Sequence, residues 1–321
     1  MKMLNRLGRA LATLGALILT LQEAPAQDTL KIAVGQRGNW DTSVSELGQR
    51  VGIFKKHGLT LEILYTQGGG ETQQAVISGS VDIGVAAGIM GTLSAFSKGA
   101  PVRIIGAETT GAGDLFWYVR ADSPIKALKD TDGKTIAYST NGSSTHGVAS
   151  AFVKENGLKA KLVGTGGPPG TLTQVMSGQI DVGWAAPPFG LEALDQGKIR
   201  LIATGNDAAS FKGQTVRVLL TNVQTLQTRK SAVERYMKAY RETVDWMYAD
   251  PAALKTYAEF AGISEALAKR SRDDFFPKAS IDPDKVVGLD VIVPDAVTLK
   301  YTAAELTKEQ LGDLIQIPPR Q

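Results

Sequence analysis

The chain of 321 residues contains no cysteine, and this absence excludes several kinds of chemistry. Disulfide bonds, thiolate metal sites, a cysteine nucleophile and a lipid-modified cysteine behind an export signal are all ruled out. The chain has only two histidines. It has no Gly-x-Ser-x-Gly or His-x-x-x-His motif and no cluster with metal-ligand spacing, so neither a hydrolase triad nor a metal centre is indicated. We therefore expect a protein without enzymatic activity, metal or cofactor.

Long apolar runs are missing from residues 27–321, so no membrane-spanning helix is predicted there. A shorter apolar run at residues 11–21 is too short to cross a bilayer as a helix. It follows a basic start and precedes the sequence Ala-Pro-Ala at 24–26, an order typical of a secretory signal peptide. We expect cleavage after Ala26 and a soluble periplasmic protein without a lipid anchor.

Charge of one sign is not concentrated in any segment. The formal net charge is +3, and the basic residues form no stripe with interleaved aromatics, so nucleic acid is not an expected partner. The glycine-rich loop at 164–170 lacks the Gly-Lys-Ser/Thr ending of a phosphate-binding P-loop. We expect this loop, which contains Gly167, to line a ligand cleft rather than to bind a nucleotide.

One short sequence motif occurs twice in the chain. Residues 76–87, VISGSVDIGVAA, return at 175–186 as VMSGQIDVGWAA. Each copy reads as the end of an amphipathic helix, a glycine stop and a short strand opened by Asp. The copies are too far apart for a solenoid repeat of about 20–50 residues. The repeat predicts two related α/β lobes, with a ligand cleft at the carboxyl ends of their strands.

The rest of the chain alternates between strand and helix patterns, which predicts largely parallel sheets. Strands are expected at residues 30–34, 59–65, 81–86, 102–107, 115–120, 135–138, 161–164, 180–184, 201–203 and 217–221. Helices are expected at residues 44–57, 72–78, 91–97, 145–156, 171–177, 189–195, 230–249 and 251–261.

Several short motifs stand in an order that resembles a known family. They are KIAV at 31–34, GIFKKHGL at 52–59, the two Gly-x-x-Asp-x-Gly phrases, DSPI at 122–125, LKD at 128–130, GKTIA at 133–137 and GSSTH at 142–146. In this order they resemble the periplasmic solute-binding proteins of ABC importers, in particular the nitrate/sulfonate/taurine (NitT/TauT) group with the type II binding-protein fold. The resemblance covers essentially the whole mature chain.

The resemblance implies two Rossmann-like lobes with mixed, largely parallel sheets, joined by a two-strand hinge with a cleft between them. The chain would cross near residues 116–118 and 214–218. The implied domains are the signal peptide at 1–26, the first part of lobe 1 at 27–115, lobe 2 at 116–215, and a return to lobe 1 with C-terminal helices at 216–321. The implied partners are an ABC permease and its ATPase, with the binding protein itself a monomer.

The resemblance does not name the solute. A small organic anion, such as a sulfonate, a taurine-like compound or a carboxylate, is the first expectation, and a thiamine-precursor pyrimidine or an aromatic acid is an alternative. A periplasmic ligand sensor for a membrane receptor and an enzyme on the same fold are the alternative functions. Neighbouring genes for a permease and an ATPase would favour the importer, and a neighbouring histidine kinase the sensor.

The segment at residues 139–146 is the first candidate for the ligand site. It follows a strand and opens a helix, so free backbone N–H groups and the positive end of the helix dipole favour an anionic head there. The hydroxyls of Ser143, Ser144 and Thr145 add donors, although ordinary N-capping also explains such residues. Gly88, Ile89 and Thr92 occupy the matching strand end in lobe 1.

Aromatic and cationic side chains are the next candidates. Trp40 and Trp184 are expected either as cleft walls or as packing residues, and Arg37 either as a partner for an acid head or as a solvated surface residue. Arg217, at the second crossover, is the second cationic candidate. The predicted ligand-binding set is Arg37, Trp40, Gly88, Ile89, Thr92, Asn141, Ser143, Ser144, Thr145, Gly167, Trp184 and Pro187.

Overall fold

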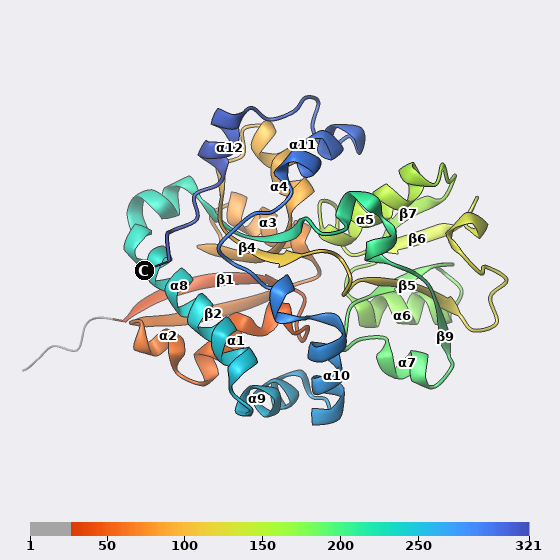
Figure 1. Ribbon diagram of the computed structural model, residues 1–321, viewed down its shortest axis with the longest axis horizontal. Coiled ribbons are helices and arrows are strands. Elements are labelled where there is room, and N and C mark those ends of the chain that lie inside the picture. The colour runs from red at the N-terminus through yellow and green to blue at the C-terminus, as the bar shows by residue number, and fades with distance from the viewer. Residues whose placement is uncertain (1–26, 321) are drawn as a thin grey trace, which may run out of the picture.

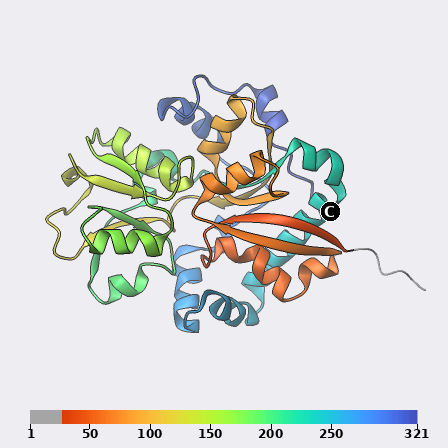
Figure 2. The ribbon, with the colours of Figure 1, turned by 180° about the vertical axis from the view of Figure 1, so that it is seen from behind.

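The computed structural model describes residues 27–320, which form two α/β lobes side by side (Figures 1 and 2). The predicted signal peptide, residues 1–26, lies outside the described residues. Within residues 27–320, no helix is both long and apolar enough to span a membrane. We call lobe 1 the larger sheet with helices α1–α4 and α8–α12, and lobe 2 the strands β5–β9 with helices α5–α7.

Lobe 1 is built on a five-stranded sheet in the order β2-β1-β3-β10-β4. Strand β1 pairs in parallel with β2 and β3, whereas β10 runs antiparallel to both β3 and β4. The strands are β1 (Asp28–Gly35), β2 (Leu59–Thr66), β3 (Ile83–Gly88), β4 (Val102–Thr110) and β10 (Thr215–Asn222). Every residue of β3 and β10 is buried, as expected for central strands covered on both faces.

Helices cover both faces of this sheet (Figure 1). Side chains alternate between the faces of β1, so that Ile32 joins one core with α1, α8 and α9 while Ala33 joins the other with α4 and α11. The lobe 1 helices are α1 (Val44–Arg50), α2 (Ile53–Lys56), α3 (Gly69–Ile77), α4 (Ile89–Ser97), α8 (Val223–Ala249), α9 (Ala252–Ala261), α10 (Glu265–Phe275), α11 (Leu289–Thr298) and α12 (Lys308–Leu314). Single 3-10 turns are η1 (Asp41–Ser43), η2 (Leu128–Asp130), η3 (Gly205–Asp207), η4 (Ala209–Phe211) and η5 (Lys278–Ser280).

Lobe 2 contains an antiparallel sheet in the order β8-β5-β9 and a parallel pair, β6-β7. A parallel bridge between Ile136 and Val182 connects the two. The strands are β5 (Phe116–Arg120), β6 (Thr135–Tyr138), β7 (Lys161–Gly164), β8 (Gly183–Ala185) and β9 (Ile199–Thr204), and the helices are α5 (Ser144–Glu155), α6 (Pro168–Met176) and α7 (Leu191–Asp195).

The predicted fold class, two α/β lobes with mixed sheets, is confirmed by this architecture. Parallel pairing holds within the β-α-β parts, whereas the strands next to the crossovers pair antiparallel. The chain passes from the larger sheet to lobe 2 between β4 and β5 and returns between β9 and β10. Residues 116–118, expected at the crossover, instead pair within lobe 2 with β8 and β9. The domain limits at 115/116 and 215/216 stay a prediction.

The sequence repeat corresponds to a repeated β-α-β unit. Asp82 accepts a hydrogen bond from the backbone N–H of Lys31 at 2.8 Å, and Asp181 accepts one from Thr135 at 2.9 Å. In each copy the Asp at the strand start is thereby attached to the neighbouring parallel strand. A pair of hydroxyl groups is repeated as well. The Oγ1 atoms of Thr66 and Thr72 lie 2.8 Å apart, and in the second copy those of Thr165 and Thr171 lie 2.7 Å apart.

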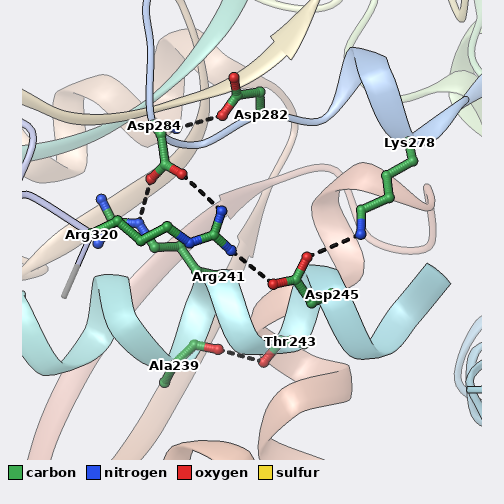
Figure 3. A network of polar contacts seen from close by, with 8 residues as sticks. All are labelled: Ala239, Arg241, Thr243, Asp245, Lys278, Asp282, Asp284 and Arg320. Atoms are coloured by element: carbon green, nitrogen blue, oxygen red, sulfur yellow. Dashed lines mark hydrogen bonds and ion pairs between the residues drawn. The ribbon is translucent and has the colours of Figure 1, made fainter. Parts of the chain in front are cut away.

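The C-terminal segment returns to lobe 1, where it covers the edge of β4. Ile315 forms a parallel bridge with Ile104, and the backbone N–H of Gln316 donates to the Ile104 carbonyl at 2.8 Å. Beyond it, Arg320 pairs with Asp245 and Asp284, and Asp284 also pairs with Arg241 of α8 (Figure 3). The bridge occupies part of the β4 edge, which is then not available to pair with another chain.

Candidate functional site

A small polar cavity lies between the two lobes at the carboxyl ends of their strands. Its walls come from the loop after β1, the start of α3, the loop between β6 and α5, the end of β8, the crossover between β4 and β5, and Arg217 of β10. This is the position at which open α/β sheets bind ligands. The cavity volume is about 30 Å³, which is room for about one water.

A much larger groove, of about 980 Å³, lies on the outer surface of lobe 1 between α8 and the C-terminal segment. It is lined by side chains of both charges and receives no residue from lobe 2. None of the predicted ligand-binding residues lines it. The smaller cavity, which collects residues from both lobes, is therefore the candidate site.

The start of α5 forms one wall of this cavity, as the sequence predicted. Ser143 is the N-cap, and its hydroxyl accepts a hydrogen bond from the N–H of His146 at 3.2 Å. Ser143, Ser144 and Thr145 all line the cavity. The first N–H groups of a helix have no partner within the helix, so this wall presents backbone donors and the positive end of the dipole.

The three hydroxyls on this wall are not equivalent. Thr145 Oγ1 accepts from the N–H of Ser139 at 2.9 Å and lies 2.9 Å from the hydroxyls of both Ser139 and Ser143. These contacts hold the loop that precedes α5. The Ser144 hydroxyl makes no hydrogen bond within residues 27–320, so it is the one most available to a ligand.

An ion triad forms the floor of the cavity. Arg217 Nη2 donates to Asp114 Oδ2 at 2.8 Å, and Arg217 Nε lies 3.0 Å from Asp41 Oδ2. The three residues are 4%, 3% and 2% exposed respectively, so the charges are almost completely desolvated. Because two carboxylates already pair with its guanidinium, Arg217 is poorly suited to bind an acid head by itself.

A third carboxyl group, that of Glu108 on β4, is completely buried beside the triad. Burial, together with the negative charge of Asp41, raises the pKa of Glu108 well above its ordinary value, although Arg217 opposes this shift. Burial likewise raises the pKa of Asp114 to about 6 against the opposing charge of Arg217. The floor of the cavity is therefore rich in carboxyl groups, a feature that the sequence patterns did not reveal.

Besides Arg217 Nε, which lies 3.0 Å from Asp41 Oδ2, two polar atoms on the cavity walls are buried without a hydrogen-bond partner in the described part of the chain. They are Nε1 of Trp184, a donor, and Oδ1 of Asp114, an acceptor. Such atoms are uncommon in native structures because an unpaired buried polar group is costly. Trp184 was a sequence candidate for a cleft wall, and the structure places it there.

Eight of the twelve predicted ligand-binding residues do not line the cavity, and four of these make contacts elsewhere in lobe 1. Trp40 is fully buried in the core of lobe 1, where its Nε1 donates to the hydroxyl of Tyr248 at 2.9 Å. Arg37 is exposed and lies 4.5 Å over the ring of Phe260. The other two are Ile89, which packs in the core, and Thr92, whose hydroxyl donates to the Gly88 carbonyl at 3.0 Å.

The remaining predicted residues lie where the lobes touch. Asn39 Nδ2 donates to the carbonyl of Pro187 at 2.9 Å and to that of Ala186 at 3.1 Å. The N–H of Gly167 donates to Gln67 of lobe 1 at 3.2 Å. Gly88 and Asn141 are also at this contact: a Cβ on Gly88 would lie 2.5 Å from the Gly142 carbonyl, and one on Gly70 would lie 2.0 Å from the Asn141 carbonyl. The sequence did not single out Asn39.

The described residues contain no group of three or more His, Cys, Asp or Glu side chains placed to hold a metal ion.

Two lobes joined by two crossovers, with a polar cavity between them, define the architecture of the periplasmic binding-protein fold. The chain belongs to the NMT1/THI5-like family, whose model matches residues 47–254. The resemblance to the nitrate/sulfonate/taurine-type binding proteins predicted from the motifs is confirmed at the level of family and fold.

Similar solved structures share this fold. The alkanesulfonate-binding protein SsuA from Xanthomonas axonopodis pv. citri, bound to MOPS, superposes with a TM-score of 0.74 at 19% identity, over 92% of this chain and 99% of that chain. The periplasmic nitrate-binding protein NrtA from Synechocystis PCC 6803 gives 0.69 at 14% identity, over 90% and 86%. The desulfurization enzyme DSZB gives 0.61 at 15% identity, over 88% and 95%. Identities this low show the fold alone.

Curated relatives include the 4-amino-5-hydroxymethyl-2-methylpyrimidine phosphate synthases THI12 and THI5 of Saccharomyces cerevisiae. Each is 24% identical over 233 residues, which cover 67% of this chain and 66% of the relative. The chain therefore spans just under two thirds of the length of these relatives. Both binding proteins and enzymes occur on this fold, so the function has to be argued from the site.

Proposed function

We propose that the protein is the periplasmic solute-binding component of an ABC importer and captures a small organic anion between its lobes. One observation carries the proposal: the start of α5, with free backbone N–H groups and the Ser144 hydroxyl, opens into a cavity enclosed by both lobes. This arrangement stabilises a carboxylate or sulfonate group without a dedicated cation. The solute-binding names of several structural neighbours support the same class of function.

The mechanism follows from the two-lobe geometry. A solute binds the lobe whose donors it meets first, and contacts such as those of Asn39 with the Ala186 and Pro187 carbonyls then hold the lobes together. Closure changes the relative position of the outer surfaces, which a permease can recognise. No covalent step is required.

A thermal-shift screen followed by calorimetry tests the proposal. The panel contains alkanesulfonates, nitrate, aliphatic and aromatic carboxylates, and thiamine-precursor pyrimidines. A ligand present at 100 times its dissociation constant adds about 2.7 kcal/mol to the free energy of unfolding. No stabilisation by any acid in the panel would contradict the proposed ligand class.

The Ser144→Ala variant tests the site itself. A hydrogen bond to a charged group contributes about 1.5–3 kcal/mol, so loss of this hydroxyl should weaken binding of the anion about tenfold to a hundredfold. Ser144→Ala leaves the N-cap at Ser143 and the loop contacts of Thr145 in place. Ser150→Ala, which removes a hydroxyl one to two turns further along α5, is the matched control and should bind as the wild type does.

The curated relatives favour a second candidate, binding or synthesis of a thiamine-precursor pyrimidine. Stabilisation by the pyrimidine but by none of the simple acids would support this candidate over the first. Conversion of any bound compound, followed by mass spectrometry, distinguishes an enzyme from a binding protein.

A further inference from the structure

A hydrogen bond outside the cavity joins a side chain of lobe 1 to a side chain of lobe 2. The hydroxyl of Tyr301, a residue between α11 and α12, lies 2.9 Å from Nδ1 of His146 in the first turn of α5. Neither residue lines the cavity. Any effect of this contact on ligand binding must therefore act through the relative position of the two lobes.

The backbone determines which form of the imidazole this contact requires. The N–H of Gly142 donates to the same Nδ1 atom of His146 at 3.1 Å. Because a backbone N–H can only donate, Nδ1 is an acceptor, and the proton of the neutral ring is on Nε2. The Tyr301 hydroxyl is then a donor to Nδ1. A proton on Nδ1 would point at the Gly142 N–H and would remove the acceptor that both groups use.

The surroundings of His146 also favour the neutral ring. Its imidazole is in contact with two phenol rings, at centroid distances of 4.4 Å for Tyr138 and 5.6 Å for Tyr301. Burial lowers the pKa of His146 and raises the pKa of both tyrosines, so all three groups are uncharged at neutral pH. The other titratable side chains of α5, of the elements that pack most extensively against it and of residues 299–307 are exposed, so none is buried against the imidazole to stabilise its charged form. They are Lys154, Glu155, Lys161, Lys300 and Glu305.

We propose that the Tyr301–His146 pair is a latch that holds the lobes in their closed arrangement and is released when His146 is protonated. Separation of the lobes withdraws Tyr301 and exposes the imidazole to water, where it binds a proton more readily. Closure on a solute then releases this proton, so the affinity falls as the pH drops below about 6.5, the ordinary pKa of histidine. Release of one proton limits this fall to about tenfold per pH unit. The inference rests on the proposed function, because it assumes that the lobes close on a solute.

An NMR titration of the imidazoles tests the latch without any ligand. The chain has only two histidines, and His57→Gln removes the signal of the other one. In the protein without its N-terminal 26 residues, the His146 ring should carry its proton on Nε2 at pH 7.5. Tyr301→Phe keeps the aromatic contact but removes the donor, so it should raise the pKa of His146 toward the ordinary value. Tyr65→Phe is the matched control, because the Tyr65 hydroxyl donates to Glu46 within lobe 1, and it should leave the His146 pKa unchanged. The same His146 pKa in Tyr301→Phe and in the wild type would overturn the latch.

Calorimetry with ethanesulfonate as the probe connects the latch to ligand capture. At pH 7.5, Tyr301→Phe should bind about twofold to tenfold more weakly than the wild type, the range expected for one neutral hydrogen bond, and Tyr65→Phe should bind normally. His146→Gln cannot titrate, so its affinity should fall less between pH 7.5 and pH 5 than that of the wild type, whereas Asp114 titrates in both proteins. An equal fall in the two proteins would overturn the release of a proton by His146. Failure of ethanesulfonate and of every other acid of the panel to bind would remove the proposed function, and the imidazole titration would then still decide whether the latch exists.

Discussion

At the scale of single residues, the buried carboxyl groups of Glu108 and Asp114 make the folding stability of the protein depend on pH. Both pKa values are raised, because burial disfavours the ionised form and Arg217 only partly compensates. For a carboxyl group whose pKa is higher in the folded state than in the unfolded chain, folding binds a proton. The folded state is therefore most stable at pH values below the ordinary pKa of the group. This part of the stability is lost as the pH rises from that value through the pKa of the group in the folded state. For Asp114 this loss falls between about pH 4 and pH 6.

The Glu108→Gln substitution tests this linkage. Gln resembles the protonated acid, so the variant should unfold at a temperature close to that of the wild type at pH 5 and should be the more stable protein at pH 9. Thermal unfolding of both proteins without ligand at pH 5, 7 and 9 is the measurement. A large loss of stability of the variant at pH 5 would show that Glu108 is ionised in the folded protein.

At the scale of elements, the close approach of α4 and α5 depends on glycine. Gly91 of α4 lies so near the loop before α5 that a Cβ on it would be 2.2 Å from the Gly142 carbonyl. A backbone atom cannot move aside as a flexible side chain can. The two lobes can therefore reach this contact only because Gly91 has no side chain.

The Gly91→Ala variant should separate folding from closure. Ala is favoured over Gly within a helix by about 1 kcal/mol, so the unliganded variant should be at least as stable as the wild type once the lobes move apart. Its affinity for ligand should nevertheless fall, because the added methyl group obstructs the lobe contact. Calorimetry and thermal unfolding together check this. Gly312→Ala in α12, where a Cβ would meet nothing within 4 Å, is the control and should bind normally. Normal binding by Gly91→Ala would mean that ligand capture does not require this contact.

At the scale of the whole molecule, the size of the cavity requires motion. About 30 Å³ accommodates a water but not an organic acid, so a solute can reach the start of α5 only if the lobes separate. The crossovers at 111–114 and 205–214 are the segments able to act as a hinge, since within residues 27–320 only they connect the two sets of strands along the chain.

Small-angle scattering measures this motion directly. The protein without its N-terminal 26 residues should have a smaller radius of gyration when saturated with ligand than without it. The Gly91→Ala variant should show a smaller change than the wild type. An unchanged radius in the wild type at saturating ligand would argue against hinged closure.

Local sequence patterns predicted much of the architecture. The repeat at 76–87 and 175–186 identified two related β-α-β units because glycine stops and strand-opening Asp residues are local signals. Element boundaries were less well predicted: α3 and α6 were expected from Thr72 and Thr171, yet they begin at Gly69 and Pro168. Their first turns are rich in glycine and proline, residues that do not by themselves predict a helix in a hydrophobic pattern.

The helix start at 143–145 was also predictable, because a strand, a glycine and a run of hydroxyl residues are adjacent in the chain. The positions of the Trp40 and Arg37 side chains were not predictable from the sequence. Trp40 follows a strand at the correct edge of the sheet, but it packs at a ring-centroid distance of 5.0 Å against Tyr257 of α9, which joins lobe 1 only through the fold. The local sequence around a loop residue does not indicate a packing partner so distant in the chain.

By itself, then, the sequence determined the class of fold, the family and the electropositive wall at α5, because periodicity, glycine placement and capping act over a few neighbouring residues. Only the tertiary structure decided the acidic floor. Asp41, Glu108, Asp114 and Arg217 belong to four separate segments, and none is distinctive in its own local sequence. Their charges interact because the two crossovers bring β4, β10 and the loop after β1 to one point, where burial removes the water that would otherwise screen them.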